Sequence, residues 1–286
     1  MDGLTPAGAT VITRREGDVC YLQLHRPDAD NAINDAMLAD CGAVLRDCAA
    51  WARVVVLEGL PHVFCPGADL HEAGRSRPDR QVAARNAEAL YGLWLLLKRG
   101  PFISIAHVRG KVSAGGVGFV AACDLVLCAD DATFALPELL FGLIPACVLP
   151  FLADRVGSAR AHAMTLLTQT VAAPQAVAWG LADASAADSA NLLRMHLLRL
   201  RLLPREAIAR YKRYAASLDG GLEAARDKAV AANAELFSDP ATHDKLARYA
   251  ATGQFPWEVV GKPVCSQARV RKRKAWAATC SSGFPI

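Results

Sequence analysis

Apolar residues come in short runs along the first 190 positions, and these runs alternate between a period of two and a helical period. Residues 10–24 alternate on both sides of a turn at 16–18, which predicts two paired strands. The run at 54–57 is short and β-branched, which predicts a buried strand. Between these strands a one-sided apolar stripe predicts a helix with Asn34 as its N-cap; the stripe consists of Met37, Leu38, Cys41, Val44, Leu45 and Cys48.

The pattern changes further along the chain. The charged stretch 71–85 is expected to form a mobile surface loop, and residues 191–249 carry a continuous helical pattern. The pattern predicts an α/β fold with a core over residues 1–190 and a helical region over 191–260. Within the core we also expect helices at 86–98, 152–168 and 174–179, a further helix after the glycine-rich run at 113–118, and strands at 102–108, 124–128 and 133–136.

Composition narrows the class of protein. The chain has 286 residues, 53% of them hydrophobic, which is enough for one large core. Its net charge of +4 is concentrated in the tail 261–286, which holds no acid and no periodicity and is expected to be disordered. The body is close to neutral, so nucleic acid is not expected as its partner.

Cysteine usage and hydropathy exclude further classes. The nine cysteines are odd in number and form no CxxC pair, so neither a zinc site nor a disulfide framework is predicted. No apolar run is long enough to cross a bilayer and no basic, then apolar, leader begins the chain. We therefore expect a cytoplasmic protein that binds no metal and no membrane.

Two glycine-bearing turns carry the first candidate chemistry. Residues 64–69 (FCPGAD) follow a buried strand, and residues 113–118 (SAGGVG) open a helix. Small residues let a ligand approach backbone N–H groups, and two such groups converging on one point would form an oxyanion hole. Considered singly, either run favours a plain turn over a binding site.

One acid stands out from its surroundings. Glu138 lies in an apolar stretch of the chain, where a carboxylate either finds a partner or has a raised pKa suited to proton transfer. A glutamate that caps a turn is the alternative.

Together these features resemble the crotonase (enoyl-CoA hydratase/isomerase) superfamily. The resemblance implies a spiral of ββα repeats, a helical C-terminal region used for trimer or hexamer packing, and an acyl thioester substrate. It implies that the backbone N–H groups of Ala68 and Gly115 form the oxyanion hole, that Gly67 lines it, and that Glu138 is catalytic. The resemblance rests on RPDADNAIN (26–34), FCPGAD (64–69), AGGVGFVAACD (114–124), PELLFGLIP (137–145) and AVAWGL (176–181).

One position departs from the family pattern. Hydratases of the superfamily carry two catalytic glutamates, and the first of them falls here on Gly118, which has no side chain. The arrangement of two carboxylates that activates water is therefore missing, which argues against ordinary fatty-acid β-oxidation.

Longer segments, among them VVLEGLPHVFCPGAD (55–69) and TGQFPWE (252–258), are similar to the dehydratases of polyketide β-branching cassettes. This resemblance implies removal of water from 3-hydroxy-3-methylglutaryl-ACP to give 3-methylglutaconyl-ACP. It implies no cofactor besides the phosphopantetheine of the acyl carrier protein (ACP), or coenzyme A, that carries the acyl group. The alternatives are an enoyl isomerase or decarboxylase of the same superfamily, or a non-enzymatic relative that binds RNA or a synthase.

The group that protonates the leaving hydroxyl stays open, because Gly118 cannot supply a proton. Either Glu138 returns the proton, or another side chain donates it. The candidates are Cys147, His62, Tyr91 and Asp69, for which a structural role is in each case the alternative.

The substrate's free carboxylate calls for a cation. Lys111 and Arg109 precede the glycine run, and alternation along one strand would place both on one face as substrate-binding residues. Solvated surface cations are the alternative. His107, in the same segment, is expected to be a core residue with satisfied hydrogen bonds.

Overall fold

The computed structural model describes residues 5–6, 10–73, 79–218 and 220–258. It contains a seven-stranded sheet of order β1-β2-β3-β4-β6-β8-β11 and a four-stranded sheet of order β10-β9-β7-β5. The large sheet is formed by β1 (Thr5–Pro6), β2 (Val11–Glu16), β3 (Val19–Leu24), β4 (Val54–Glu58), β6 (Ile103–Val108), β8 (Leu125–Ala129) and β11 (Ala184–Ala186), and the small sheet by β5 (Val63–Cys65), β7 (Lys111–Ser113), β9 (Thr133–Ala135) and β10 (Val171–Ala172).

The chain visits the two sheets in turn, which confirms the predicted ββα repeats. Strand β4 joins the large sheet, β5 joins the small one, and α3 (Arg80–Arg99) follows. Strands β6 and β7 with α4 (Gly115–Ala122) repeat the unit, and β8 and β9 begin a third. Each repeat thus contributes one parallel strand to each sheet and covers them with a helix.

The first helices largely follow the sequence pattern. Helix α1 (Asp35–Trp51) begins where predicted, since Asn34 Oδ1 accepts a hydrogen bond from the Met37 amide at 3.1 Å. The expected loop at 71–85 is wrong at both ends. A short helix α2 (Leu70–Ala73) precedes it, and α3 begins at Arg80, where the side chain of Asp79 caps it; residues 74–78 lie outside the described part.

The single helix predicted at 152–168 is also wrong. The structure has two helices there, α5 (Val148–Val156) and α6 (Ser158–Leu167), separated by Gly157. The φ angle of Gly157 is +79°, a conformation that ends a helix and favours glycine. The helix predicted at 174–179 is present as α7 (Ala173–Trp179). Two 3-10 turns, η1 (Pro27–Ala29) and η2 (Glu138–Phe141), complete the core region.

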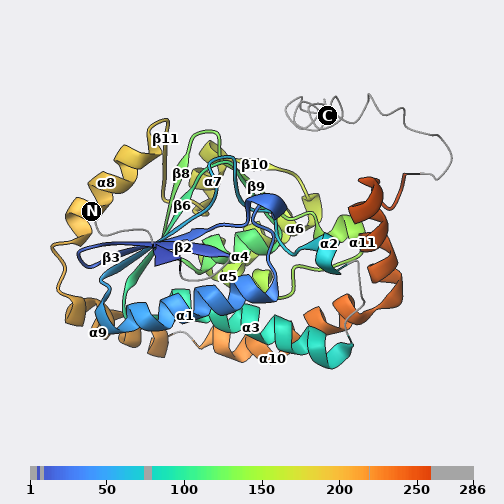
Figure 1. The fold of residues 1–286 in the computed structure, drawn as a ribbon, viewed down its shortest axis with the longest axis horizontal. Coiled ribbons are helices and arrows are strands. Elements are labelled where there is room, and N and C mark those ends of the chain that lie inside the picture. The colour runs from blue at the N-terminus through green and yellow to red at the C-terminus, as the bar shows by residue number, and fades with distance from the viewer. Residues whose placement is uncertain (1–4, 7–9, 74–78, 219, 259–286) are drawn as a thin grey trace.

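The C-terminal part is helical, as predicted. Figure 1 shows α1, α3 and α10 side by side along one edge of the molecule, and α11 at its end beside α2. None of the helices within the described ranges is long and apolar enough to cross a membrane, and the predicted tail 261–286 lies outside those ranges. The C-terminal helices are α8 (Ser189–Leu200), α9 (Arg205–Leu218), α10 (Gly221–Ser238) and α11 (Pro240–Thr252).

Candidate active site

The three segments that carry the candidate site residues leave the same edge of the small sheet. Strands β5, β7 and β9 are neighbours and run parallel, with Val63 opposite Lys111 and Val112 opposite Phe134. The carboxyl ends of parallel strands meet at one edge, where ligands of α/β proteins bind. The turn at 66–69 follows β5, the turn at 114–115 follows β7, and residues 136–138 follow β9. The topology therefore brings together three segments that are far apart in sequence.

The first two turns are in direct contact. A Cβ atom on Gly67 would lie 2.7 Å from the Cβ of Ala114 and 3.2 Å from the amide nitrogen of Gly115. The φ angle of Gly67 is +100°, which a larger residue rarely adopts. Glycine is therefore required at position 67 both by the backbone conformation and by the close approach of the second turn.

The amides of Ala68 and Gly115 are left available. The residues on either side of Ala68 bond to Ile33, through Ile33 N–H to Gly67 O at 2.8 Å and Asp69 N–H to Ile33 O at 2.9 Å. Gly115 is the first residue of α4, where an amide has no partner within its own helix. Within the described part of the chain neither amide donates a hydrogen bond. Two unpaired donors on adjoining turns are the components of an oxyanion hole.

Backbone strain lies next to this pair of amides. Ala114 has φ +49° and ψ −124°, an unfavourable conformation for a residue with a Cβ. Its amide donates to Ala135 O at 3.0 Å and so fixes the second turn to β9. The strained residue thus sets the direction in which the peptide of Gly115 points.

Asp69 holds the first turn in place, the structural role that its sequence position favours. Its Oδ1 accepts from the Glu72 amide at 3.0 Å, and its Oδ2 accepts from Arg26 Nη2 at 2.9 Å. Burial alone would raise the pKa of Asp69, but these hydrogen bonds and the Arg26 charge hold it below its ordinary value. A carboxylate kept ionised in this way is a poor proton donor.

Glu138 begins η2 and is 9% exposed. Its Oε2 is buried and has no hydrogen-bond partner among the described residues. Burial raises the pKa of Glu138 from 4.5 to about 7. The carboxyl group therefore combines the two properties that the sequence indicates, burial and a raised pKa.

Trp94 is a residue of this region to which the sequence assigns no role beyond packing. A Cβ on Gly118 would lie 2.3 Å from Trp94 Cη2, so the indole fills the space above that glycine. Trp94 is fully buried, and its Nε1 has no partner in the described residues. An apolar helical stripe gives no signal for this contact, because it depends on how α3 packs against α4.

Arg109 and Lys111 are not brought together with Glu138. The premise of one continuous strand is wrong, since Gly110 with φ +68° separates β6 from β7. Lys111 begins β7, and its amide donates to His62 O at 3.2 Å, while Arg109 Nη2 lies 4.0 Å from Glu58 Oε1. All these residues lie at the amino end of β7, opposite to the edge from which the three segments of the candidate site leave.

The remaining candidates for the second proton are placed in structural contacts. Cys147 Sγ donates to Ala229 O at 3.8 Å, and Tyr91 Oη donates to Leu222 O at 2.6 Å, so both side chains are directed at α10. Burial raises the pKa of both groups, that of Cys147 to about 12. The side chain of His62 is 72% exposed. His107 bridges Glu58 and Ser189, in the satisfied core position predicted for it.

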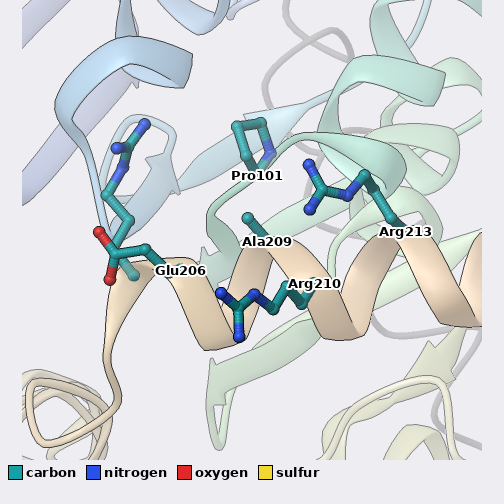
Figure 2. A pocket seen from close by; sticks show the side chains of 6 residues that line it. Pro101, Glu206, Ala209, Arg210 and Arg213 are labelled. Atoms are coloured by element: carbon teal, nitrogen blue, oxygen red, sulfur yellow. The ribbon is translucent and has the colours of Figure 1, made fainter.

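A hollow between α9 and Pro101 contains none of the predicted residues (Figure 2). Arg205, Arg210 and Arg213 line it, and Arg205 also donates to the carbonyl oxygens of Ala49 and Ala52 at the end of α1. Nowhere in the described ranges do three or more His, Cys, Asp or Glu side chains gather as they would around a metal ion. The edge of the small sheet is therefore the candidate site.

Comparison with known proteins identifies the family. Residues 14–259 match the family described as enoyl-CoA hydratase/isomerase. The chain is 49% identical over 250 residues to the bacillaene synthase dehydratase PksH of Bacillus subtilis. The aligned region covers 87% of this chain and 96% of that protein. It is 32% identical over 174 residues to the 2,3-dehydroadipyl-CoA hydratase of Escherichia coli, covering 60% of this chain and 67% of the relative.

A solved structure gives the same result for the fold. The polyketide biosynthesis enoyl-CoA hydratase pksH from Bacillus subtilis superposes with a TM-score of 0.82 at 48% identity, covering 86% of this chain and 99% of the other. The ββα repeats, the two adjoining amides and these similarities agree with one another. The protein is an enzyme of the enoyl-CoA hydratase/isomerase family.

Proposed function

We propose that this enzyme is a dehydratase of polyketide biosynthesis that converts 3-hydroxy-3-methylglutaryl-ACP to 3-methylglutaconyl-ACP. The observation that carries the proposal is the buried carboxyl of Glu138, whose Oε2 has no partner among the described residues, in a family member that has no side chain at position 118. The 49% identity to a bacillaene synthase dehydratase supports the reaction class. The substrate itself is inferred from the resemblance of the sequence to β-branching dehydratases.

In the proposed reaction the thioester oxygen accepts hydrogen bonds from the amides of Ala68 and Gly115. These bonds strengthen as negative charge develops on that oxygen, and losing one such donor typically raises the barrier by about 3–4 kcal/mol. Because the donors are backbone groups on anchored turns, little reorganisation accompanies the reaction.

Glu138 is the proposed acid and base. Its carboxylate removes the proton from the α-carbon, and the electron pair of that C–H bond passes into an enolate whose negative charge lies on the thioester oxygen. The same electron pair then forms the double bond between the α- and β-carbons as the C–O bond at the β-carbon breaks, and the departing hydroxyl takes the proton from Glu138 and leaves as water. A pKa of about 7 suits both steps, because neither protonation state is strongly disfavoured near neutral pH.

The proposed partners are the carrier protein that delivers the acyl group and further copies of this chain. Large apolar side chains are exposed on the helices α8 and α9 and the turn between them, among them Leu198, Leu202, Tyr211, Tyr214 and Leu218. Exposed apolar surface of this kind is typical of an interface. We propose that this surface packs in a trimer or a hexamer.

The test is incubation of the purified enzyme with ACP carrying 3-hydroxy-3-methylglutarate, followed by mass spectrometry of the carrier. We expect a loss equal to one water. The same acyl group on coenzyme A and a carrier with crotonate are the comparison substrates. Loss of carbon dioxide, or an unchanged mass with a shifted double bond, would instead support a decarboxylase or an isomerase.

A further inference from the structure

We infer that Trp94 determines the specificity of this site, because its indole fills the space in which a second catalytic side chain would have to lie. The inference deepens the proposed function and concerns the same site. It rests on the packing of α3 against α4, on the position of Gly118 relative to Gly115, and on the rigidity of the indole.

Gly118 and Gly115 lie on the same face of α4. They are three residues apart, and residues at this spacing are neighbours on a helix surface. Gly115 carries one of the two available amides, so a side chain at position 118 would project beside the oxyanion turn. This is where a second carboxylate could reach water or the leaving hydroxyl.

The six-membered ring of Trp94 occupies that space. A Cβ on Gly118 would lie 2.3 Å from Cη2, 2.4 Å from Cζ2 and 2.7 Å from Cζ3 of the indole. Carbon atoms pack favourably at about 3.5–4.0 Å, so even one methyl group at position 118 overlaps the ring by about 1 Å. The ring and a side chain at position 118 therefore exclude each other.

The indole cannot easily move aside. It is fully buried between Phe119 and Phe151, with ring centroids at 5.9 and 5.6 Å and nearly perpendicular planes. Tyr91, one turn earlier on α3, is fixed by its hydrogen bond to Leu222 O on α10. Close packing on several sides makes Trp94 a fixed wall rather than a mobile side chain.

The chemical consequence concerns water. An indole can donate a hydrogen bond but cannot accept a proton, so it cannot activate a water molecule for addition to a double bond. With Trp94 in place, no side chain at position 118 can assist Glu138, so among the described residues hydration has to run as the reverse of the single-glutamate elimination and not by a two-carboxylate route. Emptying the space and adding a carboxylate should therefore increase hydration.

The experiment is a double-mutant cycle with Trp94→Leu, Gly118→Glu and the double variant. Thermal unfolding is measured at equal protein concentration, together with hydration of crotonyl-ACP. We expect Gly118→Glu alone to lower Tm by at least about 5 °C because it overpacks the core. In the Trp94→Leu background at least about half of that loss should disappear, because coupled neighbours are not additive.

Hydration of crotonyl-ACP should be at least about tenfold faster in the double variant than in either single variant, as an added acid–base group provides. Gly220→Glu is the matched control, because a Cβ at that exposed position meets nothing within 4 Å. Its effect on Tm should be the same in the Trp94→Leu background as in the original enzyme, because the effects of sites that share no contact add.

Additive Tm changes would overturn the inference, as would a folded double variant that hydrates no faster than the single variants. Coupling of the same size between Gly220→Glu and Trp94→Leu would also overturn it, because the effect would then not depend on contact with the indole. Should the double variant not fold, Gly118→Ala with Trp94→Leu tests the same coupling in Tm. Coupling in Tm without any dehydration by the original enzyme would refute the proposed function and leave the placement of Trp94 intact.

Discussion

Two acidic side chains, Asp124 just before β8 and Glu138 after β9, differ in their hydrogen bonding. The Oδ2 of Asp124 accepts from the amide and hydroxyl of Ser104 at 2.8 and 3.1 Å and from Lys212 Nζ at 2.6 Å. The Oε2 of Glu138 accepts from no described group. Buried polar groups in folded proteins are almost always paired. The carboxylate of Asp124 fastens helix α9 to the core, whereas the Oε2 of Glu138 is left with hydrogen-bonding capacity that the described residues do not use.

Among the variants that test this comparison, Glu138→Gln is expected to have the largest effect, which is a loss of activity. The amide has nearly the same shape but cannot take the α-proton, so kcat should fall by about 10²–10⁴-fold. The dehydration assay with the loaded carrier protein measures the change. Glu206→Gln on the exposed start of α9 is the matched control and should leave kcat unchanged. If the Glu138→Gln variant keeps more than a tenth of the activity, Glu138 is not the base.

The contribution of the Asp124–Lys212 contact to stability is tested by Lys212→Met. Lys212 is 7% exposed and also donates to Phe102 O at 2.9 Å, so its removal leaves the negative charge of Asp124 without its cation and takes a donor away from Phe102 O. Losing one partner of such a pair typically costs about 3–5 kcal/mol. Urea unfolding at fixed protein concentration should show this loss in the free energy of unfolding. Lys228→Met, at an exposed position on α10, should change it by less than about 0.5 kcal/mol.

A third prediction uses the pH dependence of stability. The pKa of Glu138 is about 7 in the folded protein against an ordinary value of 4.5, so the folded state binds this proton more tightly than the unfolded state. The resulting stabilisation is fully present below pH 4.5 and is lost as the pH rises through 7. Glu138→Gln stays uncharged, so it should be more stable than the original enzyme by up to about 3 kcal/mol near pH 8.

The stability difference should nearly vanish near pH 4.5. Chemical unfolding of both proteins at the two pH values measures it. The kcat/KM of the original enzyme should rise with pH through about 7, as the base loses its proton. A Glu138→Gln variant that is less stable than the original enzyme at pH 8 would contradict the unpaired state of the carboxylate.

Much of this site could be predicted from sequence, because its elements are local. The turn at Gly67, the start of α4 at Gly115 and the single acid in an apolar stretch each leave a signal within a few residues. The helix cap at Asn34 is equally local, and the structure confirms it. What brings these turns to one edge is the parallel pairing of β5, β7 and β9, which the ββα order implies but does not specify in register.

The errors have physical causes as well. The helix predicted from 86 begins at Arg80, because the polar residues before 86 show no apolar periodicity. The side-chain cap at Asp79 fixes the start of α3 instead. Gly157 breaks a stripe that continues in sequence, because its backbone has positive φ. The contact of Trp94 with Gly118 depends on how two helices pack, and no local pattern encodes that.

The smallest expected effect concerns the two cations whose position was predicted along one strand. Lys111 and Arg109 lie at the amino end of β7, whereas the available amides and Glu138 follow the carboxyl ends of the strands. Lys111→Ala and Arg109→Gln should therefore change the kcat/KM of dehydration by no more than about twofold, as surface substitutions do. A hydrogen bond to the substrate's free carboxylate would be worth more, and its loss would raise KM by about tenfold or more. Such a rise for Lys111→Ala, with Tm unchanged, would mean that the acyl chain extends along β7 past its amino end, and the edge of the small sheet alone would then be too small a site.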